Sequence, residues 1–147
     1  MAMIGRVILA DLADRLNAPD LLRLFAAAFG SREAALRAGK RFQAGDWIPL
    51  GYEEDCEIIA FLGLESVSKS AARIRGIAVS PHHRGQGVGR ELIQAVRLRN
   101  PRVTLKAETD HDAVNFYRRC GFEATSLGER YPGVERFECV LRGDAED

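Results

Sequence analysis

The sequence has little cysteine, no net charge and no long hydrophobic run. Its three cysteines, Cys56, Cys120 and Cys139, form no CxxC pair and are odd in number, so we expect reduced thiols and a cytoplasmic protein. The 21 basic residues balance the 21 acidic ones, which argues against general nucleic-acid binding. No stretch approaches the roughly 20 apolar residues that span a bilayer, and the first residues lack the pattern of a signal peptide. Neither a nucleic acid nor a membrane is therefore an expected partner.

Length and apolar content define the broad class of protein. The chain has 147 residues, of which 46% are hydrophobic. This length and composition predict a single globular domain over residues 1–147, with a substantial core. The acidic segment 143–147 is expected to be disordered.

Apolar periodicity and turn residues predict a mixed α/β sheet. Strands are expected at Ile4–Ala10, Trp47–Tyr52, Glu57–Leu64, Ala71–Val79, Arg102–Ala107, Phe122–Leu127 and Val134–Leu141. Helices are expected from the N-cap Asn17 to Gly30, from the N-cap Ser31 to Phe42, from Gly87 to Leu98, and from the N-cap Asp110 to Gly121. This order of elements differs from that of a regular doubly wound fold.

A glycine-rich segment, residues 84–89 (RGQGVG), separates the fourth expected strand from the third expected helix. Glycine has no Cβ, so an anion can approach the backbone closely. The first turn of the helix adds unpaired N–H groups and the positive end of the helix dipole. Arg84 and Arg90 place a positive charge at each end of the turn. The segment is therefore predicted to bind a phosphate group.

Two common phosphate-binding patterns fit this loop poorly. The P-loop requires Lys-Ser or Lys-Thr after its last glycine, and neither is present. The dinucleotide fingerprint is GxGxxG, whereas the spacing here is GxGxG. Glu108 lies roughly 20 residues downstream, as a ribose-binding acid would, but too little chain follows for the rest of a dinucleotide fold. A nucleotide-binding protein stays open as one alternative.

Two segments resemble the GNAT superfamily of N-acetyltransferases. Residues 79–89 (VSPHHRGQGVG) are similar to its loop [RQ]-x-x-G-x-[GA], with Arg84, Gly87 and Gly89 at the matching positions. Residues 110–122 (DHDAVNFYRRCGF) are similar to its segment N-x-x-A-x-x-F-Y-x-x-x-G-F, with Asp110 in place of the usual Asn. Together the two segments cover roughly the second half of the chain.

The resemblance implies both a fold and a donor substrate. The fold would be an α/β (α+β) domain whose mixed, mostly antiparallel sheet has six to seven strands, about four flanking helices and a splay between the fourth and fifth strands. Gly76 is compatible with the bulge that accompanies this splay. The donor would be acetyl-CoA, with its pantetheine arm on the fourth strand and its pyrophosphate on the glycine loop. The residues that would hold it are Ile77, Ala78, Val79, Arg84, Gly85, Gln86, Gly87, Val88, Gly89 and Arg90.

The resemblance also implies direct transfer of the acetyl group to a primary amine in a ternary complex. Tyr117 matches the usual general acid for the departing thiolate. With a pKa of about 10 for tyrosine and about 8.5 for a thiol, complete proton transfer is uphill by about 2 kcal/mol, so Tyr117 acts as an acid or as a hydrogen-bond donor. Glu108 is the first candidate for the base and Glu65 the second. The N–H of Val79 is the candidate for stabilising the oxyanion.

The acceptor is expected to be a small-molecule or peptide amine. Tyr131, which precedes the last expected strand, is the candidate for contacting it. Arginines at 73 and 75 on the fourth strand would suit an acceptor that carries a carboxylate. Arg118 and Arg119 are candidates for the adenosine phosphates. Exposed sheet edges also allow a homodimer.

No metal site is expected. His82 and His83 are adjacent, so their side chains point in different directions, and no third ligand has suitable spacing. An alternative of another class is a non-catalytic CoA-binding sensor or interaction module, because both Glu108 and Glu65 stay open as the base.

Overall fold

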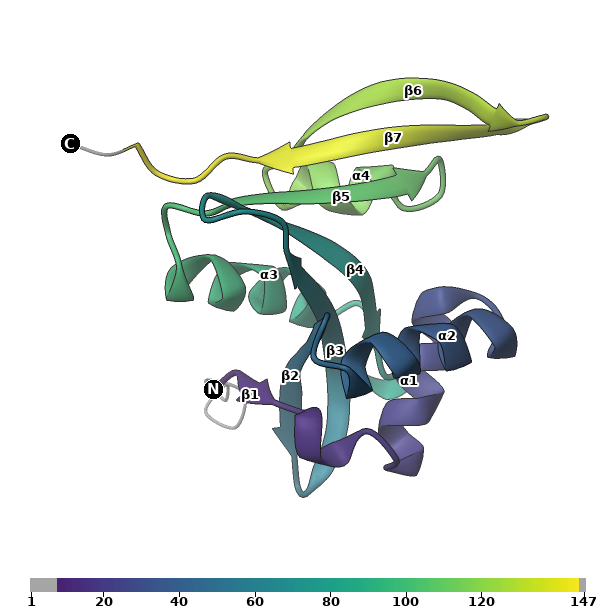
Figure 1. Ribbon diagram of the computed structural model, residues 1–147, viewed down its shortest axis with the longest axis vertical. Helices are drawn as coiled ribbons and strands as arrows, with labels where there is room; N and C mark the ends of the chain where they lie inside the picture. Colours follow the sequence, from purple (N-terminus) through teal and green to yellow (C-terminus); the bar gives the residue numbers. More distant parts are fainter. Residues whose placement is uncertain (1–7, 146–147) are drawn as a thin grey trace. The chain divides into compact units, whose positions relative to one another are not determined.

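The computed structural model describes residues 8–145, in which seven strands form one mixed sheet and four α-helices accompany it (Figure 1). The strands are β1 (Ala10–Asp11), β2 (Ile48–Glu54), β3 (Glu57–Ser66), β4 (Ala71–Val79), β5 (Thr104–Asp110), β6 (Glu123–Tyr131) and β7 (Val134–Leu141). The helices are α1 (Pro19–Phe29), α2 (Arg32–Gln43), α3 (Val88–Arg99) and α4 (Val114–Arg119), with 3₁₀ turns η2 (Ala13–Arg15) and η3 (Pro81–His83).

The sheet has the strand order β1-β2-β3-β4-β5-β7-β6. The pairs β1–β2, β2–β3, β5–β7 and β6–β7 are antiparallel. Strand β4 pairs with β5 in parallel, through Ala71–Arg73 opposite Thr104–Lys106. The predicted fold class is therefore confirmed: the sheet is mixed and mostly antiparallel, and β4 and β5 form its parallel, splayed pair, joined only through their first three residues.

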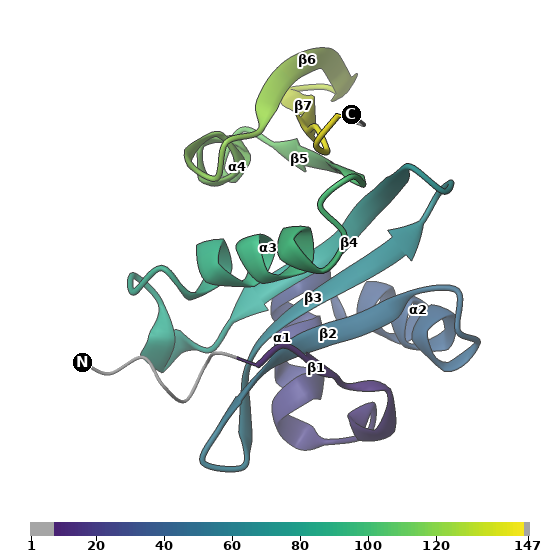
Figure 2. The same cartoon turned by 90° about the vertical axis from the view of Figure 1, so that its left-hand side faces the viewer.

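The chain divides into two compact units, and the first comprises residues 8–65 with 75–96. Figures 1 and 2 show α1 and α2 on one face of β2 and β3, and α3 on the opposite face. Phenylalanine rings from α1, α2 and β3 form the core on the first face. The Phe25 ring lies 5.1 Å from that of Phe42 and 4.8 Å from that of Phe61. On the other face, the Tyr52 hydroxyl donates to the carbonyl oxygen of Glu91 at 3.2 Å.

Local sequence sets the ends of the helices in this unit. Helix α1 begins at Pro19, whose ring fixes φ near the helical value, and its N-cap is Ala18 rather than the predicted Asn17. It ends at Gly30, which has a left-handed φ of 80° and closes the last turn through an N–H bond to Ala26. Ser31 caps α2 as predicted, since its hydroxyl accepts from the N–H of Ala34.

The second unit comprises residues 66–74 with 97–145. Its strands β5, β7 and β6 lie side by side in antiparallel order (Figure 1). The unit buries apolar side chains from these strands and from α4, namely Leu105, Ala107, Val114, Tyr117, Phe122, Phe137 and Cys139.

Two strands in this unit are longer than predicted. Strand β5 reaches Asp110 instead of ending at Ala107, because β7 continues to pair with it up to Arg136. Strand β6 continues to Tyr131, because irregularities in its pairing with β7 accommodate Gly128 instead of ending the strand. Both candidate site residues Glu108 and Tyr131 therefore lie on strands rather than in loops.

Both predicted chain ends fall partly outside the described residues. Of the predicted first strand Ile4–Ala10, only Ala10 lies in β1, and residues 4–7 are not described. Of the acidic segment 143–147, residues 143–145 are described. The N–H of Gly143 donates to Thr104 Oγ1 at 3.1 Å, and Asp144 forms an ion pair with Arg97 at 2.9 Å.

Candidate functional site

The glycine loop between β4 and α3 has a backbone that requires glycine. Gly85 and Gly87 have φ values of +77° and +78°, in the left-handed region that other residues rarely adopt. A Cβ added at either position would meet no atom within 4 Å. The two glycines therefore serve the backbone conformation and leave open space beside the loop.

Helix α3 starts directly after this loop. Its first helical hydrogen bond runs from the N–H of Glu91 to the carbonyl of Gly87 at 3.0 Å. The N–H groups of residues 88–90 precede that bond, so they lie outside the helix's own bonding pattern. Val88 and Gly89 are buried, whereas Arg90 is exposed. The helix start thus combines free amide donors, the positive end of the helix dipole and a cationic side chain.

Side-chain contacts hold the residues before the loop. Arg84 Nε donates to the carbonyl of Val79 at 3.1 Å, and Gln86 Nε2 donates to that of His82 at 3.3 Å. His83 Nε2 lies 3.1 Å from a carboxylate oxygen of Glu54, at the end of β2. The Glu54 contact could not be predicted from the sequence, because it joins residues far apart in the chain.

The end of β4 lies against two aromatic rings of the first unit. The Arg75 guanidinium lies 5.4 Å from the Trp47 ring, while a Cβ on the next residue, Gly76, would lie only 2.7 Å from the ring of Phe29. The Phe29 and Trp47 rings stack on each other at 6.4 Å. Only glycine therefore fits beside Phe29 at this position.

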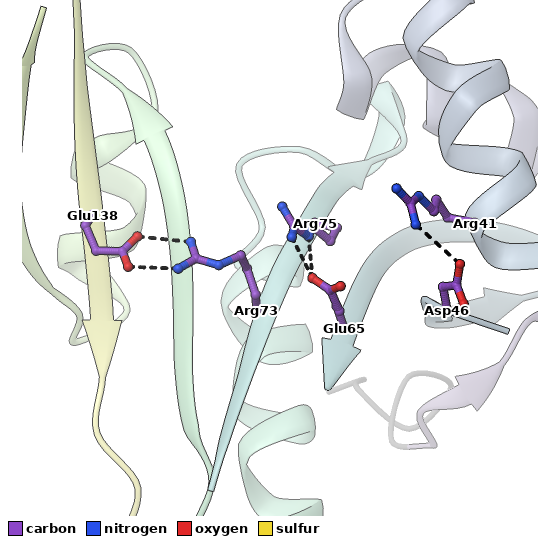
Figure 3. A network of polar contacts seen from close by, with 6 residues as sticks. All are labelled: Arg41, Asp46, Glu65, Arg73, Arg75 and Glu138. Atoms are coloured by element: carbon purple, nitrogen blue, oxygen red, sulfur yellow. Dashed lines mark hydrogen bonds and ion pairs between the residues drawn. The ribbon is translucent and has the colours of Figure 1, made fainter. Parts of the chain in front are cut away.

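The two arginines of β4 that are candidates for binding an acceptor have different partners (Figure 3). Arg73 makes two parallel hydrogen bonds, of 3.0 and 2.9 Å, to the two carboxylate oxygens of Glu138 in β7. Arg75 directs both Nε and Nη2 to a single oxygen of Glu65, at 2.8 and 2.6 Å. The second candidate base, Glu65, is therefore ion-paired with a candidate acceptor-binding residue.

In the second unit, Tyr117 is buried on α4 between aromatic rings. The rings of Phe116 and Phe122 each lie 5.2 Å from its own. Burial is the main cause that raises the pKa of Tyr117 far above its ordinary value, and the nearby thiols of Cys139 and Cys120 raise it further. At neutral pH Tyr117 is therefore a protonated hydrogen-bond donor.

The other candidates of the second unit lie on β5, β6 and α4. Glu108 is half-exposed and accepts a hydrogen bond from Arg136 Nε at 3.1 Å. Tyr131 is 67% exposed at the end of β6. Arg118 donates to Asn115 and packs over the Phe137 ring, and Arg119 is exposed. The first candidate base therefore also has an arginine partner.

A cavity of about 330 Å³ lies in the first unit beside the glycine loop. Its apolar lining comes mainly from α1 and β3, and its polar lining includes both charge signs. The lining residues are Asp20, Arg23, Leu24, Ala27, Glu57, Ile58, Ser80, Pro81, His82 and Arg84. Sequence reasoning did not find this cavity, because helix α1 contributes to it from a distant part of the chain.

A strand, a left-handed glycine turn and a helix start flanked by arginines form an arrangement that suits a phosphate-bearing ligand. The profile of the acetyltransferase (GNAT) domain matches residues 48–124, which is more than half of the chain. The chain therefore belongs to the GNAT family of acetyltransferases, as the sequence resemblance implied. A search of curated protein sequences found no significant match.

Solved structures share the fold at low sequence identity. An aminoglycoside 6′-N-acetyltransferase complexed with coenzyme A is 13% identical, with a TM-score of 0.79 over 96% of this chain and 99% of that one. The ribosomal-protein-S18-alanine N-acetyltransferase of Escherichia coli is 18% identical, with a TM-score of 0.77 over 95% and 96%. A GNAT family acetyltransferase from Elizabethkingia anophelis with acetyl-CoA bound is 18% identical, with a TM-score of 0.71 over 92% and 97%.

The structure also bears on the expected absences. Within residues 8–145, no helix has both the length and the apolar content needed to cross a bilayer. In the same part of the chain, no three His, Cys, Asp or Glu side chains gather as metal ligands would.

Proposed function

We propose that the protein transfers the acetyl group of acetyl-CoA to a primary amine by direct attack in a ternary complex. The observation that carries the proposal is the glycine turn with positive φ at Gly85 and Gly87, directly before the free amides of α3. Two neighbours with the same fold support the donor assignment, because one was solved with coenzyme A and another with acetyl-CoA.

The proposed donor site lies on the β4 end and the loop. The backbone of Ile77, Ala78 and Val79 pairs with the pantetheine arm, and the loop amides from Gln86 to Arg90 bind the pyrophosphate. Open space at the two left-handed glycines fits this role, since a Cβ would point into it. Arg84 and Arg90 supply the opposing charge, and charge-assisted hydrogen bonds of this kind contribute about 1.5–3 kcal/mol each before association costs.

Tyr117 supplies the proton or hydrogen bond that the departing thiolate needs. Its raised pKa keeps the hydroxyl protonated at neutral pH. The same shift makes complete transfer of the proton to a thiol, with a pKa of about 8.5, less favourable than for an ordinary tyrosine. We therefore assign Tyr117 mainly as a hydrogen-bond donor that stabilises negative charge as it develops on sulfur.

Glu108 stays the first candidate for the base that takes a proton from the amine, and Glu65 the second. Each is partly exposed, and each is held by one arginine, Arg136 or Arg75. Tyr131 is proposed to contact the acceptor, because it is an exposed aromatic at the end of β6.

The test is a panel of amines with acetyl-CoA, followed by detection of the free thiol. Release of thiol that depends on the amine would support the transfer. In Tyr117→Phe, kcat at saturating substrates should fall, whereas the matched variant Tyr52→Phe, which loses a hydroxyl bonded to Glu91, should keep its kcat. An unchanged kcat in Tyr117→Phe would remove this residue from the mechanism.

One observation favours a second candidate function, a CoA-binding sensor or interaction module without catalysis. Both candidate bases are engaged by arginines instead of facing a substrate unpaired. Such a protein would bind acetyl-CoA without releasing thiol with any amine of the panel.

We also propose a cytoplasmic location, because Cys56 and Cys139 are free thiols and Cys56 is exposed. A homodimer formed through an exposed sheet edge is proposed as well, since β6 ends the sheet and most of its residues are exposed. Size-exclusion chromatography with light scattering would detect the dimer.

A further inference from the structure

Arg73 and Arg75 on β4 are the two arginines that would suit an acceptor with a carboxylate, and they differ in how their partners engage them. Two nitrogens of Arg73 donate to Glu138, one to each carboxylate oxygen. Arg75 instead directs two nitrogens at one oxygen of Glu65 (Figure 3). Among residues 8–145, Nη1 of Arg75 and Oε2 of Glu65 have no hydrogen-bond partner, so this pair presents one donor and one acceptor to a ligand.

Trp47 holds the Arg75 guanidinium in place. The guanidinium lies 5.4 Å from the Trp47 ring centre, within the range of a cation–π contact. Trp47 is itself fixed, since its ring stacks on Phe29 and meets Phe42 edge-on at 5.6 Å. Arg75 therefore presents its free nitrogen with little freedom left to lose on binding, which favours affinity.

The position of the pair links it to the reaction. Arg75 directly precedes Gly76, and the residues proposed to bind the donor begin at Ile77. At about 3.3 Å per strand residue, the Cα atom of Arg75 lies roughly 7 Å from that of Ile77. A ligand on Arg75 and Glu65 would thus lie beside the strand that is proposed to bind the donor.

From this arrangement we propose that the acceptor is an amino-acid-like zwitterion, bound with its carboxylate on Arg75 and its amine on Glu65. This inference rests on the proposed acetyl transfer. The Arg75–Glu65 pair has no net charge and offers one site of each sign, so it matches a ligand with both charges. A plain amine would satisfy Glu65 alone and leave Nη1 of Arg75 without a partner.

The chemistry balances with these groups. The amine nitrogen forms a bond to the acetyl carbonyl carbon, and the bond from that carbon to sulfur breaks. The ammonium loses two protons: one leaves through Glu65 to solvent, and the other is matched by the proton that the sulfur gains. The proposal thus selects Glu65 over Glu108 as the group that receives the proton from the acceptor.

The test compares amino acids with their carboxamides and their decarboxylated amines, with thiol release as the readout. For the preferred side chain, kcat/KM should be at least about 10-fold higher with the free carboxylate, because a charge-assisted hydrogen bond contributes about 1.5–3 kcal/mol. In Arg75→Gln this preference should vanish through a higher KM, and Arg75→Lys should recover part of it. Equal rates with acids, amides and amines in the wild-type protein would overturn the inference.

Arg41→Gln is the matched control. Arg41 also lies over the Trp47 ring, at 5.9 Å, and also has a carboxylate partner, Asp46 at 3.4 Å, but it lies on α2 and is largely exposed. Its substitution should leave the preference unchanged. Loss of the preference in Arg41→Gln to the same degree as in Arg75→Gln would indicate a general effect on Trp47 and would contradict the assignment.

Calorimetry separates this inference from the proposed function. Amino acids and their amides are titrated into the wild-type protein and Arg75→Gln in the presence of CoA. Turnover of plain amines without a carboxylate preference would overturn only the acceptor class. Absence of thiol release from every acceptor would overturn the acetyl transfer, and absence of amino-acid binding in the same samples would overturn the zwitterion site as well.

Discussion

Tyr117 is a titratable residue that lies buried in the second unit. Its pKa is raised above the ordinary value of about 10, chiefly by burial. Above pH 10 the unfolded chain loses the phenol proton first, while the folded protein retains it. The contribution of Tyr117 to the free energy of unfolding should therefore be fully present below about pH 10. Above that pH, the free energy of unfolding should fall by about 1.4 kcal/mol per pH unit for one proton.

Urea unfolding between pH 9 and 11 would measure this effect. The pH range is roughly one unit either side of the ordinary tyrosine pKa. Tyr117→Phe should show a shallower loss of stability than the wild-type protein, and Tyr131→Phe, which changes an exposed tyrosine, should follow the wild type. Burial also raises the pKa of Cys139, but all three proteins share that contribution. The same slope in Tyr117→Phe and the wild type would contradict the assignment.

The Arg73–Glu138 pair makes a second prediction at the residue scale. Both side chains are mostly buried, at 22% and 26% exposure, and their contact is bidentate. Arg73→Gln should cost about 2 kcal/mol of unfolding free energy, between the values for exposed and fully buried pairs. Arg41→Gln breaks the much more exposed pair with Asp46 and should cost less than about 1 kcal/mol. Chemical denaturation of both variants provides the comparison, and equal losses would refute it.

Residue types were easier to predict than their partners. The sequence indicated Glu65, Arg73, Arg75, Glu108 and Tyr117 as candidates. It could not indicate that Arg73 pairs with Glu138, because 65 positions separate them in the chain. It also could not indicate how deeply Tyr117 is buried, which favours hydrogen-bond donation over complete proton transfer, the two roles that the sequence left open.

At the scale of elements, the loop before α3 gives a prediction for the donor. Gly87→Ala places a Cβ on a residue with φ of +78°, which strains the turn by about 1–2 kcal/mol, and directs a methyl group into the open space beside the loop. The Kd for acetyl-CoA should rise by at least about 10-fold, because one amide contact of roughly 1.4 kcal/mol is lost. Isothermal titration calorimetry provides the measurement.

Gly128→Ala is its control. Gly128 has nearly the same φ, +80°, and the same open surroundings, but it lies on β6. Its substitution should cost similar stability and leave the Kd for acetyl-CoA unchanged. If both variants weakened binding equally, the loss would reflect backbone strain in general rather than the glycine loop.

Most elements were predictable, and their errors have physical causes. The glycine and serine residues that end α1 and begin α2 were read correctly from their capping chemistry. Strand ends were less predictable, since pairing with β7 extends β5 by three residues past Ala107. The predicted strands leave residues 53–56 for the turn between β2 and β3. Pairing of Glu54 with Glu57 shortens it to the two-residue turn Asp55–Cys56, where both residues have positive φ, as hairpin twist requires.

For the whole molecule, binding of a ligand to the folded state alone should raise thermal stability. At a concentration 100 times its Kd, acetyl-CoA should add about 2.7 kcal/mol. This corresponds to a rise in Tm of roughly 5–10 °C for a protein of this size. NAD and ATP at the same concentration should give much smaller rises. A thermal-shift series measures all three, and an equal response to NAD would favour the nucleotide-binding alternative.

The two motifs that indicated the family lie in different compact units, 79–89 in the first and 110–122 in the second. Local patterns therefore predicted the family and the fold class well. They did not predict the strand order, in which β7 lies between β5 and β6, because non-adjacent pairing depends on long-range packing. The cavity beside Arg84 was hidden for the same reason.

The stacked position of Trp47 has a practical consequence for spectroscopy. It is the only tryptophan in the chain, so selective excitation of indole fluorescence reports on one place in the protein. That place lies against the guanidinium of Arg75 and the ring of Phe29. A molecule that draws Arg75 away from the ring changes the charge beside the fluorophore, and thus its emission. The native protein therefore carries its own optical reporter for occupancy of the acceptor site proposed at Arg75, without any added dye or label.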